Sequence, residues 1–391
     1  MRPAKPLLLC RRTKLRGHRT TLIDLRFPRL AGACALVFAT TLLLGALPAW
    51  ASSGVALPWG ADPTVSPIDR LLAQDQVAAS PAPERRVKAR RHRAAHHPAK
   101  KTRKTQARRR AHHRAHRRAP QATPSFYVRS PARSVLRRRG CRAGRHRAFG
   151  IVVLAFGKPY YNGHSYGTLT FSGRFASNRE ITAAMKTFAR AYVRCLPRRS
   201  RAHIVLARGT SNYYPTVPSM FQAGRKWARE TVFFARFLRR TGLARRVASA
   251  AAIDAEPAWN KSFVKTRDFF RGYRAYGAGH PLYNYGSLDG GVGKYWNARQ
   301  LWFVTGGMKY ARPLPEIYYP EMARQWARMS RIAVRRWGRP LRFAGLMTQH
   351  KARCGCGFRP KEAHRALVRE LRDHPKTWVW RLPAMTNIRW E

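Results

Sequence analysis

The stretch Phe149-Gly150-Ile151-Val152-Val153-Leu154-Ala155-Phe156 is almost wholly apolar and is followed by Gly157. A short, continuous apolar run that ends at a glycine is typical of a strand buried on both faces, as in a parallel sheet covered by helices. The repetition of such runs indicates several strands of this kind. They recur downstream at 203–207, 247–253, 281–285, 301–305, 316–319, 341–347 and 377–382.

Helical periodicity separates most of these runs. In 178–196, Ile181, Met185, Phe188 and Tyr192 recur at intervals of three and four residues, which places them on one face of a helix. Further helices are predicted at 219–241, 260–275, 320–337 and 360–373. About eight alternations of strand and helix over 148–391 favour an α/β fold with a (β/α)8 TIM-type barrel, and a doubly wound open sheet is the alternative.

The charge of the chain is extreme and unevenly distributed. Against 78 Lys and Arg there are 17 Asp and Glu, which gives a formal net charge of +61. This excess excludes an ordinary cytosolic enzyme with a balanced surface, and a hydrophobic content of 45% excludes a basic tail that is disordered throughout. Residues 85–179 contain no acid, whereas twelve acids lie in 180–391. The chain is therefore built from unlike parts.

The N-terminal part has the features of an export signal. Residues 1–29 are rich in Lys and Arg, an apolar run extends from Leu30 to Trp50, and Ala49-Trp50-Ala51 matches a small-x-small cleavage pattern. We predict that 1–51 is a signal peptide cut after about Ala51. If uncut, the apolar run is long enough for a single N-terminal membrane anchor. In either case the rest of the chain is expected to be secreted or held at the cell surface or envelope.

A linker is predicted from 52 to 147. Residues 52–84 are rich in Ala, Pro and Ser, and 85–118 consists almost entirely of Arg, Lys, His and Ala. Such a run repels itself and has little to bury, so we expect it to be disordered and to bind polyanions. Behind an export signal the expected partners are anionic wall polymers or lipid head groups, and a merely soluble spacer is the alternative. No motif for specific nucleic-acid binding is found.

Four cysteines remain after the signal, and in an oxidising compartment they allow three pairings. We expect Cys141 to pair with Cys195, and Cys354 to pair with Cys356 across Gly355. The alternative is a metal site formed by His350, Cys354 and Cys356. We favour disulfides and predict no metal, because this spacing is not a standard zinc motif and one ligand stays unnamed.

The segment Ile253-Asp254-Ala255-Glu256-Pro257 places two carboxylates at the end of a predicted strand. Alternate strand residues share a face, so Asp254 and Glu256 both point toward the mouth of a barrel, where barrel enzymes hold their active sites. Neighbouring carboxylates push their pKa values apart, which suits one of them to act as a general acid. The alternative is a turn-capping Asp beside a Glu that is paired with one of the many arginines.

Further candidates lie at other predicted strand ends or beside the Asp-x-Glu segment. Glu316 is the candidate partner carboxylate. Aromatic rings offer flat apolar faces, and amides give directional hydrogen bonds, so both suit a sugar; the alternative is that the rings only fill the top of the barrel, and that Asp289 is a turn residue. The predicted substrate-binding residues are Asn212, Tyr213, Trp259, Tyr283, Tyr285, Asp289, Trp302 and Tyr318.

A strand-end Asp-x-Glu followed by Tyr283-Asn284-Tyr285-Gly286-Ser287 in an exported, Arg-rich chain resembles the glycoside-hydrolase-like TIM-barrel superfamily. It is most similar to the lysozyme-type muramidases of family 25 and related secreted actinobacterial domains. Over 148–391 the resemblance implies a glycosidase that acts on cell-envelope glycan, either peptidoglycan or an associated polysaccharide. Glu256 would be its proton donor, and Asp254 would stabilise developing positive charge or orient a substrate amide.

One departure from that family bears on activity. The muramidases carry an aspartate at the end of the first strand, whereas the first predicted strand here ends at Ala155-Phe156 without an acid. This leaves open a different glycosidase, or a non-catalytic envelope protein whose inactive barrel binds glycan or polyanions.

The segment Gly163-His164-Ser165-Tyr166-Gly167 matches the nucleophile elbow G-x-S-x-G. That elbow needs a strand running directly into the serine and a helix directly after it. Here Pro159 and the residues after it separate the serine from its strand, and the residues that follow the motif alternate like a strand. A serine hydrolase is therefore not favoured. No cofactor is predicted, because the sequence has neither a P-loop nor a convincing dinucleotide fingerprint.

Overall fold

The computed structural model describes residues 119–352 and 357–391. Its main sheet has eight strands in the order β10-β11-β1-β2-β6-β7-β8-β9, and every pairing in it is parallel. The strands follow chain order around the sheet, and the last strand pairs with the first. Their bounds are β1 Ala122–Tyr127, β2 Gly150–Ala155, β6 Ile204–Ser211, β7 Val247–Asp254, β8 Leu282–Asn284, β9 Ala311–Pro313, β10 Leu346–Thr348 and β11 Met385–Trp390.

The two free edges, β9 and β10, approach each other through the residues that follow β9. Glu316 and Met347 form a parallel bridge, the N–H of Ile317 donates to Met347 O at 2.9 Å, and the N–H of Met347 donates to Pro315 O at 2.8 Å. The sheet is therefore a nearly closed, TIM-like barrel. The predicted barrel is confirmed to this extent, and the open doubly wound sheet is not observed.

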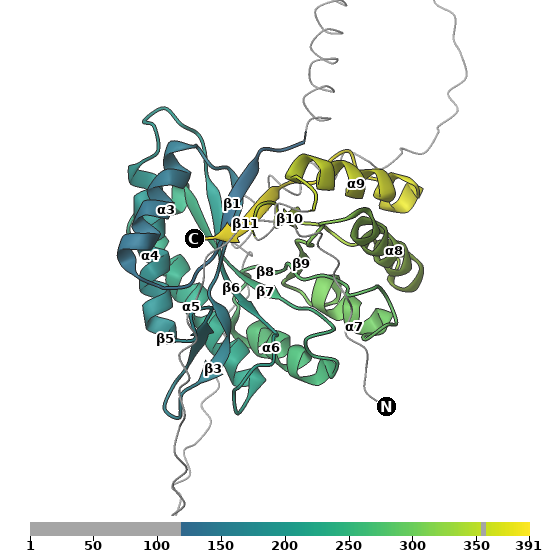
Figure 1. The fold of residues 1–391 in the computed structure, drawn as a ribbon, viewed down its shortest axis with the longest axis horizontal. Coiled ribbons are helices and arrows are strands. Elements are labelled where there is room, and N and C mark those ends of the chain that lie inside the picture. The colour runs from purple at the N-terminus through teal and green to yellow at the C-terminus, as the bar shows by residue number, and fades with distance from the viewer. Residues whose placement is uncertain (1–118, 353–356) are drawn as a thin grey trace, which may run out of the picture. The chain divides into compact units, whose positions relative to one another are not determined.

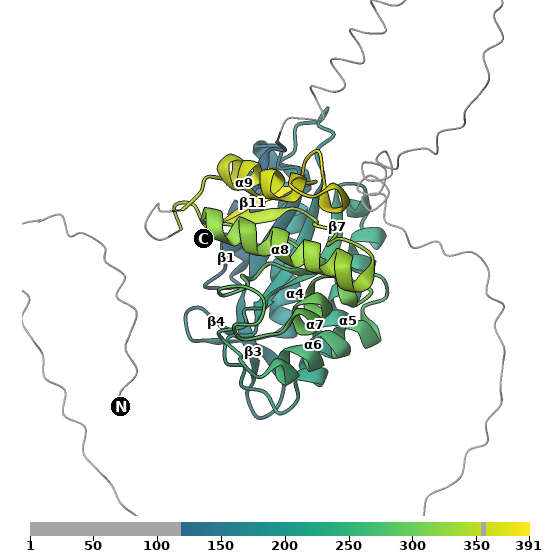
Figure 2. The ribbon, with the colours of Figure 1, turned by 90° about the vertical axis from the view of Figure 1, so that its right-hand side faces the viewer.

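Helices surround the strands, as the view in Figure 1 shows, and α8 and α9 cover the side that faces the viewer in Figure 2. The five helices expected from periodicity correspond to α4, α5, α6, α8 and α9.

A small antiparallel sheet of β3 (Gly157–Tyr161), β4 (Tyr166–Thr170) and β5 (Phe175–Ser177) is inserted between β2 and α4. The helices are α3 Arg133–Arg145, α4 Asn178–Arg194, α5 Met220–Arg240, α6 Phe263–Tyr276, α7 Ala298–Trp302, α8 Pro320–Trp337 and α9 Pro360–Arg372.

The strands are buried on both faces, as their sequences predict. In β2, Ile151 and Val153 belong to the cluster inside the barrel, whereas Val152 and Leu154 belong to the larger cluster between the strands and the helices. The interior combines small and large side chains, with alanines on β7 and with tyrosines at the end of β1, on β8 and directly after β8. Because alternate residues face the interior, the pattern fixes which side chains reach the mouth of the barrel.

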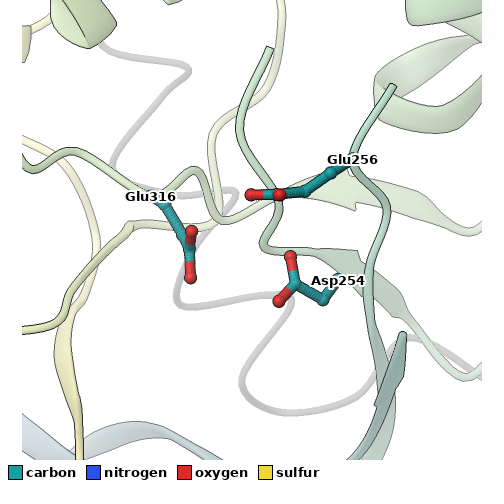
Figure 3. Close-up of side chains that lie close together, drawn as sticks. All are labelled: Asp254, Glu256 and Glu316. Carbon is teal, nitrogen blue, oxygen red and sulfur yellow. The ribbon is translucent and has the colours of Figure 1, made fainter. Parts of the chain in front are cut away.

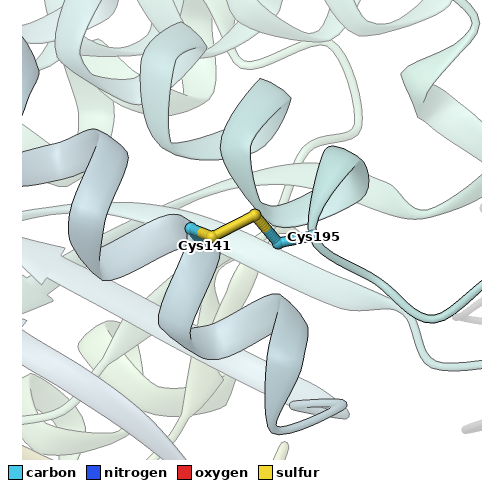
Figure 4. The surroundings of a disulfide bond; sticks show 2 residues. All are labelled: Cys141 and Cys195. Atoms are coloured by element: carbon cyan, nitrogen blue, oxygen red, sulfur yellow. A yellow bond between two sulfur atoms is a disulfide. The ribbon is translucent and has the colours of Figure 1, made fainter.

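Helices α3 and α4 are joined covalently as well as by packing. Cys141 of α3 and Cys195 at the end of α4 form a disulfide with a Cα–Cα distance of 5.0 Å (Figure 4), which confirms this predicted pairing. The helices pack closely at Gly140, because a Cβ there would lie 2.4 Å from the carbonyl oxygen of Phe188. Cys354 and Cys356 lie outside the described residues, so their predicted pairing stays a prediction.

The folded domain begins earlier than the boundary at 148. Residues of the expected linker form β1 and α3, and β1 pairs with both β2 and β11. The strand expected at 301–305 is instead the end of α7 followed by a π-helical turn, Phe303–Gly307. The strand expected at 377–382 lies at Met385–Trp390, and at 316–319 only the bridge at Glu316 forms.

The predicted signal or anchor at 1–51 and the basic segment 85–118 lie outside the described residues. Among the helices of the described ranges, none combines the length and the apolar character that a membrane span requires.

Candidate active site

Strand β7 carries Asp254 to the mouth of the barrel. Ala250 and Ala252 face the interior, and Asp254, the last residue of the strand, is at the next alternate position. Glu256 follows two residues later, and Glu316 lies three residues beyond the end of β9. All three acids are thus at the carboxyl ends of parallel strands, the end at which barrel enzymes build active sites.

The three carboxyl groups converge. One oxygen from each of Asp254, Glu256 and Glu316 lies within 4.8 Å of the others, and Figure 3 shows the three groups pointing toward a common space. Asp254 and Glu316 are only 5% and 2% exposed, whereas Glu256 is half-buried. Glu256 is consequently the carboxyl group that a molecule arriving from solvent would meet.

Burial and mutual repulsion raise the pKa of all three acids. The pKa of Glu256 rises to about 7, mainly because it is desolvated and also because Asp289 is near. Burial raises the pKa of Asp254 and that of Glu316 well above their ordinary values, and the charge on neighbouring carboxyl groups raises both further. None of the described charged neighbours that shift these pKa values is a cation.

The absence of a cation among these described neighbours bears on the two interpretations of the Asp-x-Glu segment. Four ion pairs are found among the described residues, and none of them includes Asp254, Glu256 or Glu316. A carboxylate kept for structure in so basic a chain would be expected to pair with an arginine. Burial and the neighbouring carboxyl groups instead raise the pKa of each acid, and shifts of this kind are common at sites of acid–base chemistry.

The backbone of Glu256 is held by Asn212, the residue after β6. Asn212 Oδ1 accepts from the N–H of Glu256 at 3.0 Å, and its Nδ2 donates to Glu256 O at 2.9 Å and to Thr266 Oγ1 at 3.2 Å. The N–H of Asn212 also donates to Asp254 O at 3.0 Å. Asn212 is fully buried with its amide used, so it positions Glu256 and offers substrate no free amide.

The loop after β8 supports the same segment from the other side. Asp289 Oδ2 accepts from the N–H of Ala258 at 2.7 Å, and Asp289 Oδ1 accepts from Ser287 Oγ at 2.5 Å. The N–H of Ser287 in turn donates to Glu256 Oε1 at 3.4 Å. Asn284 Oδ1 accepts from the N–H of Ala255 at 3.3 Å. Asp289 is therefore a turn residue that also fixes the chain beside Glu256.

Glu316 is held by groups from two distant parts of the chain. Gln349 Nε2, which follows β10, donates to Glu316 Oε1 at 3.1 Å and also to the hydroxyl oxygen of Tyr127 at the end of β1. Burial raises the pKa of Tyr318 and that of Tyr127 well above the ordinary value, and the nearby Glu316 carboxylate raises both further. Glu316 thus has a fixed orientation beside two tyrosines.

Aromatic rings flank the cluster on its exposed side. Tyr213 follows Asn212 and is 47% exposed, and its ring packs edge-on against the half-buried Trp259, with ring centroids 5.3 Å apart. Tyr214, 62% exposed, lies against Tyr213, and Lys158 Nζ is 5.6 Å from the centre of the Tyr213 ring. These rings form an accessible apolar surface beside Glu256.

Three other predicted substrate residues are not placed for contact. Tyr283 and Tyr285 are 2% and 1% exposed, and both fill the barrel interior. The Tyr285 hydroxyl donates to Thr210 O at 3.1 Å. Trp302 lies on α7 rather than on a strand, with its ring stacked on Trp337 at 4.8 Å. For Tyr283 and Tyr285 the packing alternative is the correct one, whereas Trp302 packs outside the barrel interior.

Four further residues belong to the site but are not among those predicted from the sequence: Tyr127, Asn284, Ser287 and Gln349. Tyr127 was missed because its strand lies within the basic stretch assigned to the linker. Ser287 and Asn284 stand in the Tyr-x-Tyr-Gly-Ser segment, whose position at a strand end was the available signal. The segment Gly163–Gly167 spans the hairpin between β3 and β4, where Ser165 Oγ donates to Asn162 Oδ1 at 3.4 Å, so the geometry of a nucleophile elbow is not present.

The same three carboxylates are the one group of three acidic, His or Cys side chains in the described ranges whose ligand atoms could reach a common metal ion. Oxygen ligands of this kind suit Ca²⁺ or Mg²⁺, which need at least six ligands in all. The carbonyl oxygen of Glu256, another possible ligand, already accepts from Asn212. The three carboxyl groups are as well suited to hold protons as to hold a metal ion.

No family model matches the chain, and a search of curated proteins likewise finds no match. The chemistry of the site must therefore be argued from its own geometry.

Proposed function

We propose that this barrel is a glycoside hydrolase that acts on a cell-envelope glycan, with Glu256 as its general acid. Glu256 is the most accessible acid of the cluster, and a pKa of about 7 keeps it partly protonated at neutral pH. An acid with a pKa near the working pH transfers a proton to a leaving-group oxygen most effectively. The observation that carries the proposal is this accessible, partly protonated Glu256 beside two buried carboxyl groups.

Glu316 is the proposed partner of Glu256, because the two reach the site from different strand ends and can flank a glycosidic bond. Asp254 is the last residue of β7, two residues before Glu256. From there it can stabilise positive charge on the sugar or orient a substrate amide. Retaining glycosidases hold their two carboxyl groups about 5 to 5.5 Å apart, whereas inverting enzymes leave room for a water. Oxygens within 4.8 Å favour retention.

The choice of a glycan rests on the surface beside Glu256. The exposed faces of Tyr213 and Tyr214, together with Trp259, suit the apolar faces of sugar rings. The choice of an envelope glycan rests on the export signal and the basic segment 85–118, which would hold the protein on anionic polymers. Peptidoglycan and its associated polysaccharides combine both properties.

The test is reducing-end release from purified peptidoglycan and from wall polysaccharide, measured for the wild-type chain, Glu256→Gln and Glu321→Gln. Glu321 is an exposed glutamate on α8, so its variant has the same change of charge and size away from the site. We expect release by the wild type and by Glu321→Gln, and no release by Glu256→Gln.

Three results would change the account. Equal release by all three proteins would move the active site away from Glu256. Binding to the glycan without release by the wild type would favour a non-catalytic glycan-binding barrel. Loss of release on addition of EDTA, restored by Ca²⁺ or Mg²⁺, would show that the three carboxylates hold a metal ion.

A further inference from the structure

A strongly cationic cavity lies at the opposite end of the barrel from the three carboxylates. It has a volume of about 370 Å³. Ala311, the first residue of β9, lines it, whereas Asp254 is the last residue of β7. Because all strands of the main sheet are parallel, the two sites lie at opposite ends. Its cationic lining residues are Arg274, Lys309, Arg312, Arg339 and Arg342.

The charge of this cavity exceeds the basic background of the chain. Five of its twelve lining residues are Lys or Arg and none is acidic, whereas Lys and Arg make up 78 of the 391 residues overall. The five come from four separate segments: the last turn of α6, the residues after the π-helical turn, β9, and the connection from α8 to β10. The fold thus gathers cations that are far apart in the sequence.

Two of the guanidinium groups are held in place by the backbone. Arg339 Nη2 donates to Gly306 O at 3.4 Å, and its guanidinium carbon lies 5.3 Å from the centre of the Trp302 ring. Arg312 Nη1 donates to Ala311 O at 3.0 Å and to Lys309 O at 3.3 Å. Cations that are oriented before a ligand arrives lose less entropy on binding it.

From this arrangement we propose that the cavity binds a phosphate-bearing ligand. Arginine presents several donors in a planar fork that matches phosphate oxygens, and lysine adds a point charge. The volume is at the lower end of the range for small-molecule sites, about 300 to 1,000 Å³, which suits a diphosphate or a sugar phosphate. Trp302 is already stacked on Trp337, so recognition rests on charge and on donors. This proposal does not depend on the proposed glycosidase activity.

The test is hydrogen–deuterium exchange of the full chain at physiological salt, with and without inorganic pyrophosphate. A local readout is needed because the basic segment 85–118 also attracts anions. We expect pyrophosphate to protect the peptides that cover 302–312 and 337–342. In Arg339→Gln/Arg342→Gln the pyrophosphate concentration that gives half-maximal protection should rise by about tenfold or more, since charge-assisted hydrogen bonds are lost.

The matched control is Arg335→Gln/Arg336→Gln, which removes two exposed arginines from the last turn of α8 and should leave the protection unchanged. Both pairs are exposed, so both variants should fold, and their thermal midpoints check this. An equal effect of the two pairs, or no protection of these peptides in the wild type, would overturn the proposal. A parallel titration with poly(glycerol phosphate) identifies the source: protection by the polymer indicates a wall phosphodiester, and protection by pyrophosphate alone indicates a small soluble phosphate.

Discussion

The side chain of Asn212 hydrogen-bonds both backbone groups of Glu256. Its Oδ1 accepts from the N–H at 3.0 Å, and its Nδ2 donates to the carbonyl oxygen at 2.9 Å. The two residues follow different strands, β6 and β7, so this pair of hydrogen bonds fixes where the candidate acid stands relative to the barrel. The proposed acid is therefore held by an amide that never needs to touch the substrate.

Removal of that amide should impair turnover more than binding. We expect Asn212→Ala to lower kcat by about 10- to 100-fold with a small change in KM, since displacing a catalytic group by about 1 Å costs rate of this order. Steady-state kinetics on the glycan would check this. Asn162→Ala is the control, because Asn162 also hydrogen-bonds a loop backbone but lies in the β3–β4 turn. Equal losses in the two variants would contradict the positioning role.

Activity should fall as the pH rises above neutrality. The proposed acid must be protonated, and Glu256 loses its proton as the pH passes its pKa of about 7. Above that value kcat/KM should decline by about tenfold per pH unit. The measurement is kcat/KM from pH 5 to 9. A profile that stays flat from pH 6 to 9 would show that Glu256 is not the acid.

The raised pKa of Glu256 also predicts a pH-dependent cost in stability. Its pKa in the folded protein, about 7, lies above the ordinary 4.5, so the folded state binds more protons than the unfolded state and loses stability as the pH rises between these values. Glu256→Gln should raise the free energy of unfolding at pH 8 by roughly 1 to 3 kcal/mol.

At pH 4 the gain from Glu256→Gln should largely disappear, because the acid is then protonated in both states. Urea unfolding at the two pH values measures this difference, with Glu321→Gln as the control. A gain of the same size at both pH values would indicate a packing effect and not the removal of a charge.

The barrel could be predicted from the sequence because strands buried on both faces have continuous apolar sequences, as in Ile151 to Ala155. Asp254 and Glu256 could be selected for the same reason, since strand alternation fixes their direction. Strand β1 was missed because its sequence, Ala122-Thr123-Pro124-Ser125-Phe126-Tyr127, is not a continuous apolar run and adjoins the basic stretch. The apolar residues after Trp302 were assigned to a strand although Asn297 and Gln300 form a capping box, a signal of a helix start.

Other features of the site depend on distant contacts. Tyr127 and Gln349 are 222 residues apart in sequence yet in contact, and no local pattern reveals that they meet beside Glu316. The burial of Tyr283 and Tyr285 similarly follows from the small alanines across the barrel interior. Their place at a strand end suggested contact with substrate, but the local pattern could not tell how deeply each ring lies.

The disulfide between α3 and α4 should contribute to stability by restricting the unfolded chain. It closes a loop of 54 residues, and loss of a bridge of this kind costs about 2 to 4 kcal/mol. Urea unfolding of Cys141→Ser/Cys195→Ser would measure the loss. An unchanged midpoint would mean that the packing at Gly140 suffices to hold the helices together.

The basic segment 85–118 should retain the protein on anionic polymers in a salt-dependent manner. We expect binding to purified walls to be released near about 1 M salt, where surface charges are screened. A chain without 85–118, which remains strongly basic, should elute at a lower salt concentration than the wild type. Retention of the wild-type chain unchanged near molar salt would contradict this role. The same deletion should leave the hydrolysis of soluble fragments intact.

The role of Glu256 as proton donor is tested most directly by varying the leaving group. A dinitrophenyl glycoside of the sugar found at the new reducing end needs no proton on departure, whereas the native glycan does. We predict that Glu256→Gln loses about 100- to 10,000-fold in kcat/KM on the glycan but retains nearly wild-type kcat/KM on the aryl glycoside. This ratio reports the first step, in which the leaving group departs, and not the later hydrolysis in which the same residue would act as a base. Equal losses on both substrates, or no loss on the glycan, would contradict the assignment of Glu256 as the acid.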